Sequence, residues 1–218
     1  MTTSSSDAYS RLLRKFHDQE ASFGGGFRSE LVAQLINLLN IKSVSDYGAG
    51  KRALYFKLKN EYGIDIDYFP FDPAFPEYGG PQSAELVCCL EVLEHVEPEY
   101  LESVLLELKH LVTKYGFFSV NCAAAKKFLP DGRNAHLIQQ PISWWLKQIA
   151  SSFEIQYLNK TSMNGFVMLV TPLGTISSVR NPIDISQSTS LRQHFLVAMQ
   201  RMKIEGRRRI QLVRRKTS

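Results

Sequence analysis

The segment Lys42–Leu54 is the part of this sequence around which a fold can be placed. Val44 begins a short apolar stretch that predicts a strand, and residues 52–62 predict a helix. Between them, Gly48 and Gly50 permit a tight turn that brings the backbone close to a ligand. A strand, a glycine turn and a helix in this order predict a nucleotide-type binding site at the end of the first strand.

The remainder of the sequence alternates strand and helix patterns. Residues 154–158 and 166–171 form a closing pair joined through Asn164 and Gly165, which predicts an antiparallel hairpin. This order predicts an α/β, Rossmann-like, doubly wound fold of three α/β/α layers, with a mostly parallel sheet, an antiparallel last strand and ligands at the carboxyl ends of the strands. The other predicted strands are 64–71, 86–90 and 117–121, and the other predicted helices are 29–40, 98–115 and 142–153.

Length and charge predict one domain with two tails. We expect an N-terminal tail and short helix over residues 1–28, the main domain over 29–175, and a C-terminal helix with a basic tail over 176–218. Residues 201–216 contain eight Lys and Arg and one Glu, a charge of +7. Because the net charge of the chain is +5, the other residues together carry −2. The cysteines lie in apolar runs and no apolar stretch is long enough for a membrane helix, so we expect free thiols and a cytoplasmic protein.

One carboxylate distinguishes between the ligands that the glycine turn could hold. The spacing of Gly48, Gly50 and Ala53 also fits a dinucleotide site, and Asp72 could hold a ribose hydroxyl in either case. Asp46 lies two residues before the first glycine, where its charge would repel a pyrophosphate. The same charge attracts the sulfonium and ammonium groups of S-adenosylmethionine, which is therefore the expected cofactor.

At this point the sequence resembles the class I S-adenosylmethionine-dependent methyltransferases. The resemblance rests on Asp46-Tyr47-Gly48-Ala49-Gly50-Lys51, on Asp72, and on the segment Leu90–Val96. Residues 73–83 are too few for the helix and third strand of that family, so we expect a shortened region between its strands 2 and 4. The resemblance implies that six residues bind the cofactor: Asp46, Gly48, Ala49, Gly50, Asp72 and Glu91.

Two histidines are the candidate catalytic residues. His95 follows a buried strand and His136 lies in the long polar segment 123–140, and an imidazole suits proton transfer near neutral pH. Glu91, Glu94 and His95 are spaced so that one helical turn would place them on one face, with His136 completing the set. This set resembles the Glu-x-x-Glu-His site of small-RNA 2′-O-methyltransferases, where it holds a divalent metal such as Mg²⁺, Mn²⁺ or Zn²⁺, but metal-free methyltransferases carry a similar segment.

These observations predict an S-adenosylmethionine-dependent methyltransferase, and O-methylation of a small-molecule or saccharide-type acceptor is the first interpretation. The alternative within this class is a metal-dependent, RNA-modifying enzyme of the 2′-O type that contacts RNA through the basic C-terminal tail. A nucleotide-binding module without catalysis is the alternative from another class.

Overall fold

The computed structural model describes residues 4–19, 28–161 and 164–174. The chain divides into two units, Met1–Ile176 and Ser177–Ser218, and all described residues lie in the first. The helix and basic tail expected at the C-terminus therefore lie outside the described residues. Within the three described ranges, no helix has both the length and the apolar content needed to cross a membrane.

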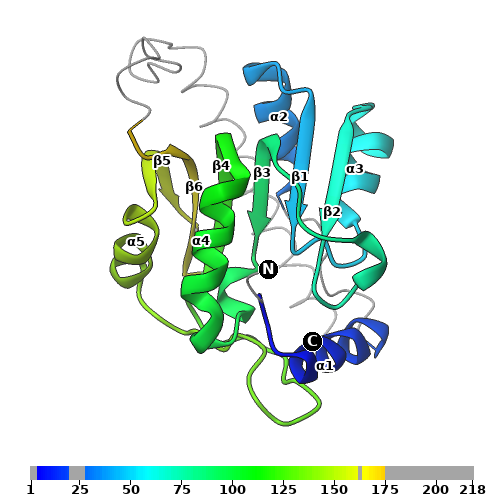
Figure 1. The fold of residues 1–218 in the computed structure, drawn as a ribbon, viewed down its shortest axis with the longest axis vertical. Coiled ribbons are helices and arrows are strands. Elements are labelled where there is room, and N and C mark those ends of the chain that lie inside the picture. The colour runs from blue at the N-terminus through cyan, green and yellow to red at the C-terminus, as the bar shows by residue number, and fades with distance from the viewer. Residues whose placement is uncertain (1–3, 20–27, 162–163, 175–218) are drawn as a thin grey trace, which may run out of the picture. The chain divides into compact units, whose positions relative to one another are not determined.

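A six-stranded sheet in the order β2-β1-β3-β4-β6-β5 forms the centre of the first unit (Figure 1). β1 pairs in parallel with β2 and β3, β3 pairs in parallel with β4, and β6 runs antiparallel to both β4 and β5. The mostly parallel, Rossmann-like sheet with its antiparallel end is thus confirmed. The strands are β1 (Ser43–Tyr47), β2 (Asp67–Phe71), β3 (Ala84–Leu90), β4 (Val112–Asn121), β5 (Phe153–Lys160) and β6 (Gly165–Pro172).

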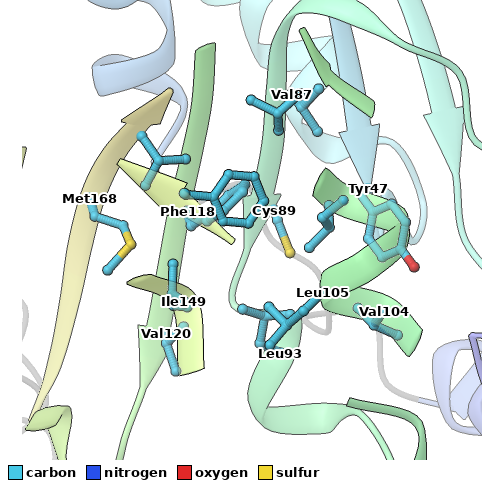
Figure 2. Packing of buried hydrophobic residues seen from close by; sticks show 14 of the residues in the cluster. Tyr47, Val87, Cys89, Leu93, Val104, Leu105, Phe118, Val120, Ile149 and Met168 are labelled. Carbon is cyan, nitrogen blue, oxygen red and sulfur yellow. The ribbon is translucent and has the colours of Figure 1, made fainter. Parts of the chain in front are cut away.

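Both faces of the sheet are buried. Figure 2 shows one face, where Val87, Cys89 and Phe118 pack with Leu105 of α4 and Ile149 of α5. Side chains alternate along a strand, so Val44, Leu86 and Phe117 point to the opposite face, and these residues are also fully buried. The helices are α1 (Asp7–Gln19), α2 (Ser29–Leu39), α3 (Ala53–Tyr62), α4 (Leu101–Leu111) and α5 (Ile142–Ala150).

The connection between β2 and β3 is short, as the sequence predicts. Residues 72–83 contain the single 3₁₀ turn Pro76–Tyr78 and pass directly from one strand to the next (Figure 1). No strand lies outside β2, which is the edge of the sheet over the described residues. Because β1, β2 and β3 are parallel neighbours, their carboxyl ends lie at the same edge of the sheet.

The predicted helix over residues 98–115 is wrong at both ends. Pro98–Tyr100 is a separate 3₁₀ turn, and α4 covers only Leu101–Leu111 before β4 begins directly at Val112. Val112 continues the apolar stripe of the helix, but its backbone pairs with Ala84 of β3. An apolar residue satisfies both patterns, and the pairing with a strand far away in the sequence decides between them.

Candidate functional site

The candidate site lies at the carboxyl ends of β1 and β3. From β1 the chain passes to β2 on one side and then crosses to β3 on the other, so the strand order reverses between β1 and β3. In open α/β sheets the crevice at such a point is the usual ligand site. The glycine turn follows β1, and the Glu91–His95 segment follows β3.

The glycine turn is fixed to the end of β2. The backbone N–H groups of Gly48 and Ala49 donate to the carbonyl of Phe71 at 2.7 and 2.9 Å. Gly48 has φ 83° and Gly50 has φ 49°, values that favour glycine. A Cβ at Gly48 would lie 2.3 Å from a methyl group of Val92. The sequence therefore needs glycine at this position because the turn packs directly against the segment that follows β3.

Asp72 connects the glycine turn to the loop after β2. One carboxylate oxygen accepts the Gly50 N–H at 2.8 Å and the other accepts the Ala74 N–H at 2.8 Å. Burial raises the pKa of Asp72 above its ordinary value, although these two bonds favour the charged form. An ionised carboxylate has further lone pairs, so Asp72 retains the capacity to accept ribose hydroxyls. Its role in binding the cofactor stays a prediction.

Asp46 is buried below the turn, with 4% of its surface exposed. Its carboxylate accepts a hydrogen bond from the Tyr68 hydroxyl of β2. Burial raises the pKa of Asp46 to about 7, against the lowering effect of this hydrogen bond. A cation near the turn would favour the ionised form and reverse this shift, but the predicted contact between Asp46 and a cationic cofactor stays a prediction.

The structure brings Glu94, His95 and His136 together. One potential ligand atom from each lies within 4.8 Å of the others, and the two imidazole rings meet edge to face with their centroids 4.8 Å apart. Glu94 accepts the Asn121 N–H at 2.8 Å through Oε1, while its buried Oε2 has no hydrogen-bond partner. Burial and the nearby Glu91 carboxylate hold the pKa of Glu94 well above its usual range.

Backbone carbonyls hold both histidine rings. Nδ1 of His95 bonds the Ala135 carbonyl at 2.7 Å, and Nδ1 of His136 bonds the Ala123 carbonyl at 2.5 Å. Burial, followed by the neighbouring His136, lowers the pKa of His95 to about 4, so this imidazole is neutral near pH 7. The long loop after β4 thus carries His136 to His95, as the sequence predicts.

Glu91 does not join the helical turn that the sequence predicts for it. The 3₁₀ turn begins at Leu93, and Glu91 precedes it with φ 58°, a left-handed conformation. The Glu91 carboxylate accepts a hydrogen bond from Arg28 at 3.2 Å, with 24% and 8% of the two side chains exposed. Glu91 therefore lies near the cluster but is paired with Arg28.

Sequence reasoning did not identify the contribution of α1 to the site. The Tyr9 hydroxyl donates to the carbonyl of His95 at 2.6 Å, and both carboxylate oxygens of Glu97 accept hydrogen bonds from Ser6. The rings of His17 and Phe75 meet edge to face with their centroids 5.1 Å apart, and the His17 ring lies 3.0 Å from the Cβ position of Gly50. The sequence predicted a short helix in this region, but not which loops it contacts.

No protein-family model and no curated protein matches this sequence. The fold is nevertheless found in solved structures. The 1,6-didemethyltoxoflavin-N1-methyltransferase of Burkholderia thailandensis, solved with bound 1,6-didemethyltoxoflavin and S-adenosylhomocysteine, is 15% identical. The alignment covers 76% of this chain and 89% of that one, with a TM-score of 0.50. A Pyrococcus horikoshii OT3 protein is 9% identical over 72% and 98% of the two chains, also with a TM-score of 0.50.

The mitomycin 7-O-methyltransferase MmcR is likewise 9% identical, with a TM-score of 0.50. The alignment covers 66% of this chain and 53% of that one, so the present chain spans about half the length of MmcR. At these identities the similarities establish the shared fold.

Proposed function

We propose that this protein is an S-adenosylmethionine-dependent methyltransferase that methylates an oxygen atom of a small-molecule or saccharide-type acceptor. The observation that carries the proposal is the glycine turn at the strand-order reversal, fixed by Asp72 and underlain by Asp46. Two carboxyl groups at this turn disfavour a pyrophosphate and favour a cationic ligand. The fold shared with the toxoflavin and mitomycin enzymes supports the same conclusion.

In this proposal the cofactor supplies a methyl group made electrophilic by the sulfonium. Gly48, Ala49 and Gly50 provide a backbone surface for it, Asp72 accepts ribose hydroxyls, and Asp46 supplies negative charge, while the charge of Glu91 is balanced by Arg28. Beyond binding, the protein holds the acceptor oxygen in line with the methyl group and removes the proton of the acceptor hydroxyl.

We assign proton removal to His136, with His95 as its neighbour in the site. A carbonyl oxygen only accepts hydrogen bonds, so Nδ1 of each ring carries the proton and Nε2 is the acceptor in the neutral form. The pKa of about 4 makes His95 a poor base near neutral pH. His95 is therefore assigned to orienting the acceptor hydroxyl, while His136 takes up its proton.

Calorimetric titration with S-adenosylmethionine, S-adenosylhomocysteine and NAD tests the cofactor assignment. We expect saturable binding of the first two and none of NAD. Asp72→Asn should weaken binding about tenfold or more, because the new amide NH₂ would face the N–H of Gly50 or Ala74. Glu85→Gln is the matched control at the opposite end of the sheet. Saturable NAD binding without a response to the other two ligands would contradict the proposal.

Methylation assays with hydroxylated small molecules and saccharides test the acceptor class. Formation of S-adenosylhomocysteine identifies an acceptor, and mass spectrometry of the product identifies the methylated atom. With that acceptor, His136→Ala should lower kcat about a hundredfold, the usual contribution of a positioned base, without changing the affinity for S-adenosylhomocysteine. An unchanged kcat in His136→Ala would show that His136 is not the base.

A second candidate function is metal-dependent 2′-O-methylation of RNA. The Glu94–His95–His136 cluster favours it, because the buried Oε2 of Glu94 lacks a hydrogen-bond partner and both imidazoles keep their protons on Nδ1. Carboxylate oxygen and neutral imidazole nitrogen are a donor set for Mn²⁺ or Zn²⁺, and the backbone bonds to Nδ1 are the support that ligating histidines usually have. A bound metal would hold two ribose hydroxyls of an RNA terminus.

Elemental analysis of protein purified without a histidine tag tests the metal. A stoichiometric divalent metal is expected if this candidate is correct. Glu94→Gln should then abolish metal binding, while Glu91→Gln should retain it because Glu91 is paired with Arg28. If the protein contains no metal and does not bind added Mn²⁺ or Zn²⁺, metal-dependent RNA methylation is excluded. The metal-free methyltransferase is then the remaining proposal.

A further inference from the structure

The loop between β4 and α5 is held near its base by the side chain of Asn134 and by a backbone bond from the Ala135 N–H to the Lys127 carbonyl at 3.0 Å. The Oδ1 atom of Asn134 accepts the N–H groups of Ala125 and His136, each at 2.9 Å, and its Nδ2 atom donates to the Ala125 carbonyl at 2.9 Å. The backbone adds an isolated β-bridge between Phe128 and Asn134. Three bonds from one amide thus hold two strands of this loop together.

The same loop provides the carbonyls that hold both histidines of the site. Ala123, two residues before Ala125, accepts from His136, and Ala135, next to Asn134, accepts from His95. Each carbonyl lies one or two residues from a backbone group that Asn134 binds. Displacement of the loop base would therefore move both carbonyls at once.

We propose that Asn134 is the positioning residue of this site: its amide closes the loop base and thereby sets the ring orientation and the Nδ1–H tautomer of His95 and His136. The importance of these rings for methyl transfer rests on the proposed function, whereas their positioning by Asn134 rests on the hydrogen bonds alone. Asn134 is a positioning residue because it acts through the two histidines.

The geometry requires the amide of asparagine. One atom must accept two N–H groups while its neighbour on the same planar group donates to a carbonyl. An aspartate carboxylate would accept both N–H groups but would place an oxygen against the Ala125 carbonyl. Alanine would leave all three backbone groups without these partners.

The tip of the loop is held independently of Asn134. The Leu129 N–H donates to the Arg133 carbonyl at 2.7 Å, and Asp131 accepts the N–H of Arg133 and pairs with its guanidinium. Asp131→Ala therefore serves as a matched control, because it alters the same loop on the side away from the histidines. Asp131→Ala loosens only the tip of the loop, whereas Asn134→Ala opens its base, so a comparison of the two variants shows which change affects the histidines.

Nuclear magnetic resonance of protein with ¹⁵N-labelled histidine tests the proposal, since the nitrogen shifts report which ring nitrogen carries the proton. In the unmodified protein we expect His95 and His136 to be Nδ1–H tautomers. In Asn134→Ala both rings should shift toward the Nε2–H tautomer that free imidazole side chains prefer, while Asp131→Ala should leave them unchanged. Circular dichroism establishes that the variants are folded.

Two results would overturn the proposal: an Nε2–H tautomer on both rings of the unmodified protein, or an Nδ1–H tautomer retained by both rings in Asn134→Ala. Should Asn134→Ala not fold, Asn134→Asp provides the same measurement, because it places a carboxylate oxygen against the Ala125 carbonyl and the repulsion between them opens the loop base. In that variant an unchanged tautomer on both rings would equally overturn it.

Binding of S-adenosylhomocysteine to the same proteins separates this inference from the proposed function. We expect affinities within about twofold of the unmodified protein, because the hydrogen bonds described for Asn134 go to Ala125 and His136 and not to the glycine turn or Asp72. Absence of binding in every protein would refute the proposed function and leave the tautomer result standing. Normal binding with unaltered tautomers in Asn134→Ala would refute the inference alone.

Discussion

At the scale of single residues, the buried carboxyl of Asp46 links stability to ligand charge. Its folded pKa of about 7 lies above the ordinary 3.8, so the folded protein holds this proton more tightly than the unfolded chain. Unfolding therefore releases a proton between these values, and stability falls as the pH rises through 7. A cofactor that carries positive charge would offset this loss, which is a reason to keep a carboxylate in so unfavourable a position.

Asp46→Asn should stabilise the free protein at high pH. The amide retains an acceptor for the Tyr68 hydroxyl and removes the buried charge. We expect the free energy of unfolding to rise by about 2 to 4 kcal/mol near pH 8 and to change little near pH 4, as the pKa difference requires. Urea denaturation at both pH values measures this, with exposed Asp65→Asn as control. An equal effect at both pH values would contradict the assigned pKa.

Gly48 and Gly63 both have positive φ, but they differ in their surroundings. A Cβ at Gly48 would lie 2.3 Å from Val92, whereas a Cβ at Gly63 meets nothing within 4 Å. Gly63→Ala should cost only the strain of the left-handed conformation, about 1 kcal/mol. Gly48→Ala should cost more than this in urea denaturation and should weaken S-adenosylhomocysteine binding. Similar losses in both variants would show that the Val92 contact is unimportant.

The sequence was informative for residues whose role depends on near neighbours in the chain. Gly48 and Gly50 were recognisable because a turn between a strand and a helix needs them, and His136 because its loop is too long for a connector. The pairing of Arg28 with Glu91 could not be recognised from the sequence, and neither could the hydrogen bonds by which Asn134 holds the loop after β4. Each depends on the distance between backbone segments that only the assembled sheet determines.

At the scale of elements, α1 connects the loops at the carboxyl edge of the sheet. Near its start, Ser6 and Tyr9 are bonded to the segment that contains His95 and Glu97; farther along, Arg14 donates to the Ala74 carbonyl and pairs with Glu77. Apolar residues of α1 also pack with Phe75 and with residues of the loop after β4. The helix therefore covers the three loops that carry Asp72, His95 and His136.

The packing of α1 should weaken in acid because His17 is held neutral in the folded protein. Burial, followed by the charge of Lys51, lowers the pKa of His17 from 6.5 to about 4. The contribution of neutral His17 to the free energy of unfolding is therefore fully present above pH 6.5. It is lost as the pH falls toward 4, which lowers the free energy of unfolding by up to ~3 kcal/mol. His17→Gln should reduce this pH dependence in urea denaturation, whereas exposed His110→Gln should not.

A direct titration gives the more stringent check on His17. The ring carbon–hydrogen signal of His17 should change near pH 4 in nuclear magnetic resonance spectra. Titration near 6.5 would mean that the ring is solvated and that α1 does not press it against Gly50 and Phe75. In that case His17 would have no part in shaping the glycine turn.

At the scale of the whole molecule, the order of strands and helices was predictable, but the boundaries set by strand pairing were not. Strand-helix alternation and the Asn164-Gly165 turn were sufficient for a mostly parallel sheet with an antiparallel end. The direct passage from α4 into β4 at Val112 could not be predicted, because the residue fits both patterns and its partner Ala84 lies in another strand. The short β2–β3 connection was predictable because chain length alone excludes a further helix and strand.

The distribution of charge along the chain gives different expectations for an RNA acceptor and for a small-molecule acceptor. Residues 177–218 contain ten Lys and Arg and two Asp and Glu, a charge of +8, which leaves −3 on residues 1–176. A net negative unit repels a polyanion, so RNA binding by this protein would depend on the C-terminal residues and would weaken steeply with salt.

Removal of residues 177–218 therefore gives opposite expectations for the two functions. The proposed cofactor site lies within Met1–Ile176, so S-adenosylhomocysteine affinity should stay within about twofold and turnover of a small-molecule acceptor should persist. An RNA-modifying enzyme would instead lose most of its RNA affinity, measurable by fluorescence anisotropy of a labelled RNA at several salt concentrations. If the shortened protein binds RNA as tightly as the whole chain, the basic residues have no role in RNA binding. RNA recognition would then have to reside in a unit of net charge −3, which requires a local site such as the Glu94–His95–His136 cluster to overcome the repulsion.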